Sequence, residues 1–256
     1  MTWPDGPLFA FDTETTGVDP MEARIVTATA FVLDPAGQHT TEWLADPGVE
    51  IPAGASEIHG ITTEHARAHG RPAAEVAGQL CLALYEGWDL GGPVIAYNAA
   101  YDLTVLDNEM QRHFGERLEI RGPVVDPFVL DKQMDRYRKG KRTLTACCDH
   151  YRVNLGDQGA HNATADTIGA ARLAWRIAQV YPEIGRADLA ELHQLQIGWY
   201  AEQADGLAKY FARQGKTEAV SREWPLRTVT LAQATAGQGP GHQTSLAGGV
   251  PQETTT

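Results

Sequence analysis

The chain contains little cysteine and no long apolar run. Its 256 residues include three cysteines, Cys81, Cys147 and Cys148, an odd number without the spacing of a metal-binding motif. The count argues against a disulfide framework and favours thiols in a reducing compartment. No stretch approaches the roughly 20 apolar residues of a transmembrane helix, and the first residues lack the basic start and apolar core of a signal peptide. We therefore expect a cytoplasmic protein with no membrane association.

The chain also lacks an excess of positive charge. Its formal net charge of −12 argues against a protein that coats nucleic acid without regard to sequence, but a local basic patch would suffice for an enzyme that acts at a strand end. Such a patch lies between residues 121 and 152, where eight basic residues face four acids. The basic residues either contact phosphate or form a solvated loop and helix face, and both alternatives stay open. The basic residues are Arg121, Lys132, Arg136, Arg138, Lys139, Lys141, Arg142 and Arg152.

The order of apolar segments predicts an α/β fold in which one mixed sheet of five strands is flanked by helices. An added C-terminal helix follows, and from about Trp224 the composition changes to Gly, Gln, Thr and Ala, which is typical of disorder. The expected divisions are a domain at 7–182, a helical extension at 183–215 and a disordered tail at 224–256. Strands are expected at 8–11, 25–33, 38–44, 93–97 and 124–126, a loop at 58–62, and helices at 72–85, 100–114, 127–134, 144–151, 163–180 and 187–213.

Two carboxylates end the first predicted strand, within the segment Asp12-Thr13-Glu14-Thr15-Thr16-Gly17. Side chains alternate along a strand, so Asp12 and Glu14 point to the same face. Unpaired charges at the end of a buried strand are costly, and no comparable group of basic residues lies beside them in the sequence. Hard divalent cations prefer carboxylate oxygen, so a metal ion is the simplest partner for this pair.

Two further carboxylates follow predicted strand or loop ends. Asp102 falls in the first turn of the helix after strand 93–97, and Asp166 falls in the first turn of helix 163–180. Asn162 is suited to cap that last helix, and His161 precedes the cap, so a histidine and a carboxylate can face one cleft. Acids near helix N-termini are common for structural reasons, but their combination with the first pair is much less expected by chance.

These motifs resemble those of the DEDDh-type 3′–5′ exonucleases of the RNase H-like superfamily, and the chain is similar to the epsilon proofreading subunits of bacterial DNA polymerase III. The resemblance covers roughly residues 7–180. The segment 12–17 resembles the family's first motif, 98–102 the second and 161–166 the third. The resemblance implies hydrolysis of phosphodiester bonds at the 3′ end of DNA, single-stranded or frayed. The products would be nucleoside 5′-monophosphates, released in proofreading or repair.

The resemblance also implies a mechanism. In this family four acids hold two Mg²⁺ or Mn²⁺ ions roughly 4 Å apart. Carried onto this chain, Asp12 bridges the two ions, Glu14 and Asp166 complete one site, and Asp102 contributes to the other. His161 is then the general base that takes a proton from the attacking water.

Other positions carry weaker expectations. Thr15, Thr16, His59 and Asn98 are expected to contact the terminal nucleotide, and Asp126 to hold its strand near the metal ions. For Thr15 and Thr16 the alternative is a turn, for Asn98 a helix cap, and for His59 a plain loop residue.

Several alternatives stay open. An RNA 3′-end trimming exoribonuclease would use the same fold, because discrimination of the sugar depends on contacts that the sequence does not display. A polymerase-associated binding subunit is a second alternative, since the apolar face of helix 187–213 would suit a polymerase partner or a homodimer. Within that helix, residues 194–199 faintly resemble a sliding-clamp peptide, although such peptides bind extended.

Overall fold

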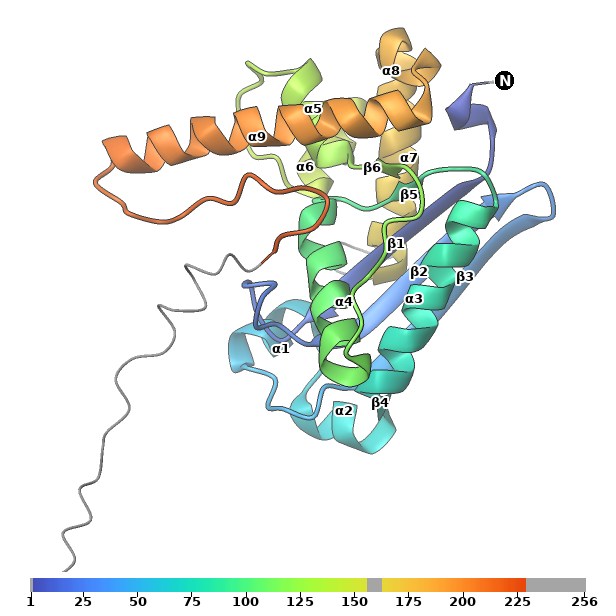
Figure 1. Cartoon of the computed structure of the whole chain (residues 1–256), viewed down its shortest axis with the longest axis vertical. Coiled ribbons are helices and arrows are strands. Elements are labelled where there is room, and N and C mark those ends of the chain that lie inside the picture. Colours follow the sequence, from blue (N-terminus) through green and yellow to red (C-terminus); the bar gives the residue numbers. More distant parts are fainter. Residues whose placement is uncertain (1, 156–162, 229–256) are drawn as a thin grey trace, which may run out of the picture.

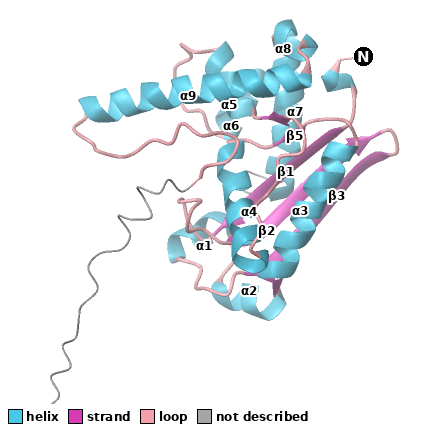
Figure 2. Ribbon diagram, in the orientation of Figure 1, coloured by secondary structure: helices cyan, strands magenta, loops and turns pink. Residues whose placement is uncertain are grey.

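The computed structural model describes residues 2–155 and 163–228. Figure 1 shows a twisted sheet with helices on both faces and a long helix across one end, and Figure 2 separates strands from helices. The elements, in chain order, are η1 (Trp3–Asp5), β1 (Leu8–Thr15), β2 (Ile25–Asp34), β3 (Gly37–Asp46), α1 (Ala53–His59), α2 (Thr63–His69), β4 (Arg71–Pro72), α3 (Ala73–Asp89), β5 (Val94–Ile95), α4 (Ala99–Phe114), β6 (Val124–Val125), α5 (Pro127–Met134), α6 (Leu144–Tyr151), α7 (Ala163–Val180), α8 (Pro182–Arg186) and α9 (Leu189–Arg213).

Within the described residues the strands form one mixed sheet in the order β4-β3-β2-β1-β5-β6. β1, β2 and β3 form an antiparallel meander, while β5 runs parallel to β1, and β6 runs parallel to β5. The predicted α/β class with a mixed sheet is confirmed. The sheet has six strands rather than the expected five, because Arg71 and Pro72 pair with the end of β3 as β4. Pro72 therefore ends a strand, and α3 begins one residue later than expected.

β1 lies in the interior of the sheet and is covered on both faces. Phe9 and Phe11 pack into the hydrophobic cluster under α3 and α4, whereas Leu8 and Ala10 belong to the cluster under α7. A strand buried on both faces reads as a continuous apolar run, as Leu8 to Phe11 does. Beyond Phe11 the polar residues begin, so the catalytic candidates lie where the strand leaves the core.

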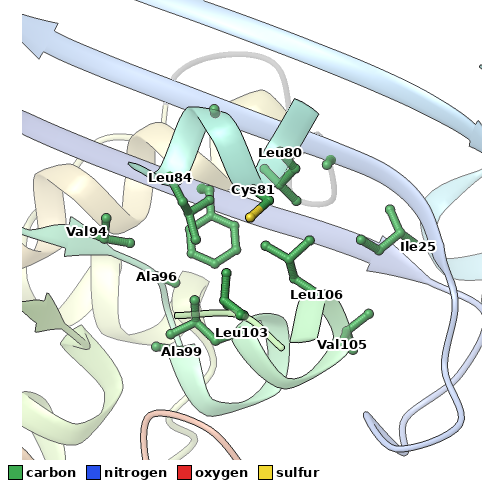
Figure 3. Close-up of a cluster of buried hydrophobic side chains, with 14 of the residues drawn as sticks. Ile25, Leu80, Cys81, Leu84, Val94, Ala96, Ala99, Leu103, Val105 and Leu106 are labelled. Carbon is green, nitrogen blue, oxygen red and sulfur yellow. The ribbon is translucent and has the colours of Figure 1, made fainter. Parts of the chain in front are cut away.

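The larger cluster is built by helices that return to the sheet. Leu80 and Leu84 of α3 lie over Leu103 and Leu106 of α4, with Val94 of β5 beside them (Figure 3). Each of these leucines is fully buried, and their spacing of three or four residues places them on one helix face. Burial of one such side chain contributes about 1.5–3 kcal/mol. This packing fixes α4, which carries Asp102, against the sheet.

The stretch around residues 58–62, expected as a loop, contains the end of one helix and the start of another. α1 ends at His59 and is closed by Gly60, which adopts the left-handed conformation at φ 78°. α2 begins after Thr62, whose side chain accepts a hydrogen bond from the backbone N–H of His65. Helices this short carry weak periodicity, which is why the sequence did not predict them.

The segment after α9 folds back along that helix, as Figure 1 shows in orange to red. Trp224 is buried, and the backbone N–H of Arg227 donates to the Thr104 hydroxyl at 2.9 Å. Residues 224–228 are thus packed on the domain, which differs from the disordered tail expected from 224. The rest of that expected tail, 229–256, lies outside the described residues. Within residues 2–155 and 163–228, no helix is both long and apolar enough to cross a membrane.

Candidate active site

Three elements bring four carboxylates to the carboxyl end of β1. Asp12 and Glu14 end that strand, Asp102 lies in the first turn of α4, and Asp166 lies in the first turn of α7. α7 packs directly on β1 and β2, and its Thr164 hydroxyl bonds to the Glu42 carboxylate of β3. Along β1, Asp12 and Glu14 are partly exposed while Thr13 and Thr15 are buried, so the predicted alternation holds.

The four carboxylates lie near enough for the charges of three of them to act on Asp12. Burial raises the pKa of Asp12 well above its ordinary value, and repulsion from three neighbouring carboxylates raises it further. In order of size the repulsions come from Asp102, Glu14 and Asp166. The structure therefore brings together the four acids that the sequence named for a metal site. The fifth predicted catalytic residue, His161, and the expected cap Asn162 lie outside the described residues.

Asp102 is the most buried member of the group, with 3% of its surface exposed. Burial raises its pKa to about 7, although hydrogen bonds from Thr13 lower it in part. The Thr13 hydroxyl donates to Asp102 Oδ1 at 2.6 Å, and the Thr13 backbone N–H donates to the same oxygen at 3.1 Å. Thr13 thus ties β1 to α4. The sequence does not indicate this role of Thr13, because the strand pattern gives no sign of its partner.

Asp126 holds two helices at the edge of the site. One carboxylate oxygen accepts the backbone N–H of Asn98, and the other accepts that of Ala99, both at 2.9 Å. The side chain also caps α5 through the N–H of Phe128 and accepts Trp224 Nε1 at 3.3 Å. Burial raises the pKa of Asp126 to about 6, while these donated hydrogen bonds lower it. Its contacts fit the expected supporting role, because Asp126 fixes the helix end that precedes Asp102.

Thr15 and Thr16 bond within the turn that follows β1. The Thr15 hydroxyl lies 2.9 Å from the carbonyl of Gly17 and 2.5 Å from the Tyr101 hydroxyl. The Thr16 hydroxyl accepts the backbone N–H of Arg24 at 3.0 Å. These contacts favour the turn-forming alternative for both threonine side chains. Tyr101, which also donates to the Gly17 carbonyl, is a site neighbour that sequence analysis did not single out.

His59 lies beside the carboxylates. With Glu14 and Ala163 it lines a cavity of about 370 Å³ between β2, β3 and the start of α7. Its Nδ1 accepts the backbone N–H of Ile61 at 3.2 Å. Burial lowers the pKa of the imidazole, and contact with the Thr15 backbone raises it in part. This half-buried position at the cavity wall agrees with the expected pocket residue.

Asn98 lies at the start of α4 in the left-handed conformation, with φ 64° and ψ 46°. Its side chain makes no cap hydrogen bond, so the cap is supplied by Asp126 rather than by Asn98 itself. The Asn98 side chain lines a second cavity, between α5, α9 and the returning segment.

The basic stretch at 121–152 divides into two parts. Arg138 and Arg142 form ion pairs with the fully buried Asp131, and Arg121 lies over the Tyr85 ring at 3.4 Å. Lys132 lies beside the second cavity, which also contains Asn98. Part of the expected patch is therefore internal structure, and Lys132 shares the lining of the second cavity with Asn98.

α9 packs on the domain by one face. Leu192 and Gln196 are fully buried, and the Gln196 amide bonds to the backbone of Asp126 and Val124. The segment 194–199 that faintly resembles a clamp peptide is helical, so it does not present the extended form. The apolar face expected to meet a partner is used, at least in part, by the chain's own domain.

Comparison with known proteins agrees with this architecture. The family model described as Exonuclease (RNase_T) matches residues 9–174. The chain is 28% identical over 171 residues to a DNA polymerase III subunit epsilon-like protein of Rhodobacter capsulatus, covering 65% of this chain and 23% of that protein. It is also 28% identical over 197 residues to a PolC-type DNA polymerase III of Thermotoga maritima, covering 76% of this chain and 14% of that protein. The chain thus spans less than a quarter of these relatives.

Two solved structures show the same fold. E. coli exonuclease I in complex with a dA16 oligonucleotide superimposes with a TM-score of 0.56 at 19% identity, covering 70% of this chain and 42% of that one. Exonuclease X in complex with 5′ overhanging duplex DNA gives a TM-score of 0.55 at 20% identity, covering 74% of this chain and 99% of that one. The predicted resemblance is confirmed, and the chain belongs to the exonuclease (RNase_T) family.

Proposed function

We propose that this chain is a two-metal-ion 3′–5′ exonuclease that removes nucleoside 5′-monophosphates from the 3′ end of DNA, single-stranded or frayed, in proofreading or repair. The observation that carries the proposal is the convergence of Asp12, Glu14, Asp102 and Asp166, whose mutual repulsion raises the pKa of Asp12. Hydrolysis of a phosphodiester agrees with membership of the exonuclease family. Action on DNA would place the protein in the cytoplasm, either alone or with a polymerase.

The donor set fits Mg²⁺ or Mn²⁺, because hard divalent ions take carboxylate oxygen. As they stand, no three His, Cys, Asp or Glu side chains among the described residues are close enough to hold one ion. Repulsion from the other three acids raises the pKa of Asp12 and Asp102 Oδ1 accepts from Thr13, so bound cations would offset the repulsion among these carboxylates.

The four acids would hold the ions as the resemblance implies, with Asp12 shared between the two sites. When bound, the ions would supply activation of water and stabilisation of charge on the leaving 3′-oxygen. His161, which precedes α7, is the proposed proton acceptor from the attacking water. His59 would border the terminal nucleotide, a role supported by its position with Glu14 in the lining of one cavity.

The test compares Asp12→Ala with Asp89→Ala, which removes an exposed acid at the end of α3. Both proteins receive 5′-labelled DNA and RNA of one sequence, with free or blocked 3′ ends, in Mn²⁺, Mg²⁺ or EDTA. We expect shortening of free-ended DNA by the Asp89→Ala control and by the unaltered protein, and none by Asp12→Ala or in EDTA. Retained cleavage by Asp12→Ala would contradict the proposal. Faster cleavage of RNA than of DNA by the unaltered protein would change the proposed substrate to RNA.

A further inference from the structure

A second cavity lies next to the proposed active site. It has a volume of about 280 Å³ and lies between α5, α9 and the segment that returns after α9. Its polar wall carries Asn98, Lys132, Gln203 and Arg227, and its aromatic wall includes Phe128 and Tyr200. We call this feature the return groove. Its volume is near the lower end of ligand-binding pockets.

The return groove carries two basic side chains for which the described residues provide no ion-pair partner. Arg138 and Arg142 of the same basic stretch are paired with Asp131, but within residues 2–155 and 163–228 no carboxylate forms an ion pair with Lys132 or Arg227. Burial lowers the pKa of Lys132 and the nearby Arg142 lowers it further, while Asp126 and Asp131 raise it in part. An anionic ligand in the groove would stabilise both charges.

Two of the residues that line the groove carry buried polar atoms without a hydrogen bond. In the described part of the chain, Arg227 Nε and Gln203 Oε1 are buried and have no partner, although each side chain is anchored at its other end. Arg227 donates through its NH2 group to the Tyr200 hydroxyl at 3.2 Å, and Gln203 Nε2 donates to the carbonyl of Val129 at 3.1 Å. Because an unsatisfied buried polar group is costly, a held donor and acceptor of this kind point to a polar ligand.

The aromatic side chains of the groove indicate which class of anionic ligand it would bind. The Lys132 ammonium lies 4.6 Å from the centroid of the Phe128 ring, and Tyr200 holds Arg227 through its hydroxyl. A groove that combines cations with aromatic side chains is typical of sites that hold single-stranded nucleic acid.

The return groove and the proposed active site are linked through the start of α4. Asn98 lines the groove and begins α4, and Asp102 lies four residues further, about 6 Å along the helix axis. Asp126 joins the two regions, since it accepts the N–H groups of Asn98 and Ala99 and the Nε1 of Trp224 in the returning segment. A strand whose end lies at the carboxylates is therefore within reach of Lys132 and Arg227.

We propose that the return groove binds the backbone of single-stranded DNA adjoining the end that is cut, with Lys132 and Arg227 contacting its phosphates. This inference rests on the proposed function for its substrate class. It assigns a role to the segment after α9, which closes the groove and supplies Arg227.

The experiment measures binding of fluorescein-labelled dT15 to the metal-free protein in EDTA by fluorescence anisotropy. The variants are Lys132→Ala and Arg227→Gln, and the matched control is Lys139→Ala, which removes an exposed charge of the same basic stretch. We expect each groove variant to raise the Kd about tenfold, which is the loss of one charge-assisted contact. We also expect the slope of log Kd against log salt to fall by roughly 0.7 per phosphate contact. Lys139→Ala should stay within roughly twofold of the unaltered protein.

Two outcomes would overturn the proposal. The first is a Kd for dT15 that is the same in both groove variants and in Lys139→Ala. The second is stronger competition by a blunt duplex than by unlabelled dT15, because paired bases cannot stack on the aromatic wall. Thermal melts of the variants check that they fold. Binding in EDTA does not depend on catalysis, so a protein that binds dT15 through these residues but cuts no substrate would contradict the proposed function and leave the return groove supported.

Discussion

Neutralising Asp12 is expected to stabilise the metal-free protein while it abolishes nuclease activity. Asp12→Asn keeps the shape of the side chain and removes one of four mutually repelling charges. Burial and this repulsion hold the pKa of Asp12 well above its ordinary value. One pKa unit corresponds to about 1.4 kcal/mol of differential interaction between the charged and neutral forms. We therefore expect Asp12→Asn to gain roughly 1 kcal/mol or more at pH 8 in EDTA.

The assay is thermal and urea unfolding of the two proteins at pH 8 in EDTA. For a chain of this size, each kcal/mol gained raises Tm by roughly 2–4 °C. The matched control is Asp107→Asn, because Asp107 is also buried but accepts hydrogen bonds from Arg117 at 2.7 Å and from the N–H of Leu118 at 2.8 Å. Loss of a charge that has partners should cost about 1–3 kcal/mol. An Asp12→Asn protein less stable than the unaltered chain would refute the electrostatic reasoning.

Three further predictions concern the surroundings of the site. The folded-state pKa of Asp102 exceeds its unfolded value, so the folded state binds more protons than the unfolded state between about pH 4 and 7. The free energy of unfolding of the metal-free protein should therefore fall as the pH rises through that window. Mn²⁺ should restore stability at pH 8 far more than at pH 5, as thermal melts would show, and equal restoration would contradict this. Asp126→Ala should lower stability by roughly 2–4 kcal/mol in urea unfolding and reduce kcat, because the α4 and α5 caps are both lost; unchanged stability would argue against its supporting role. Tyr101→Phe should cost about 1 kcal/mol in the same assay, since its hydroxyl bonds to Thr15 and Gly17, and no loss would show that these bonds contribute nothing.

The sequence predicted the elements that carry long or clearly apolar patterns. The apolar run Leu8 to Phe11 fits only a buried strand, and the spacing of the leucines in α3 and α4 fits only helices. The strand and both helices therefore lie within a few residues of their expected bounds. α1 and α2 were missed because seven-residue helices are held by caps and tertiary contacts rather than by periodicity. β4 was missed because two residues carry no strand pattern, and its pairing with β3 depends on the fold.

The acids of the candidate site could be predicted because their residue type and spacing indicate their chemistry. Four acids at element ends were named from the sequence, and the structure brings them together at β1. Their supports were not predictable, because the Thr13 bond to Asp102 and the Trp224 bond to Asp126 join residues 89 and 98 positions apart. The return groove was hidden for the same reason, since Lys132 and Arg227 meet only in the folded chain.

The most direct test of the central claim is the number of Mn²⁺ ions that the protein binds. Titration followed by electron paramagnetic resonance counts bound ions without requiring cleavage. The account predicts two Mn²⁺ per chain for the unaltered protein, and loss of binding in both sites for Asp12→Ala, because Asp12 is the ligand proposed to be shared. Two bound ions that remain in Asp12→Ala, or no binding by the unaltered protein at millimolar Mn²⁺, would contradict it.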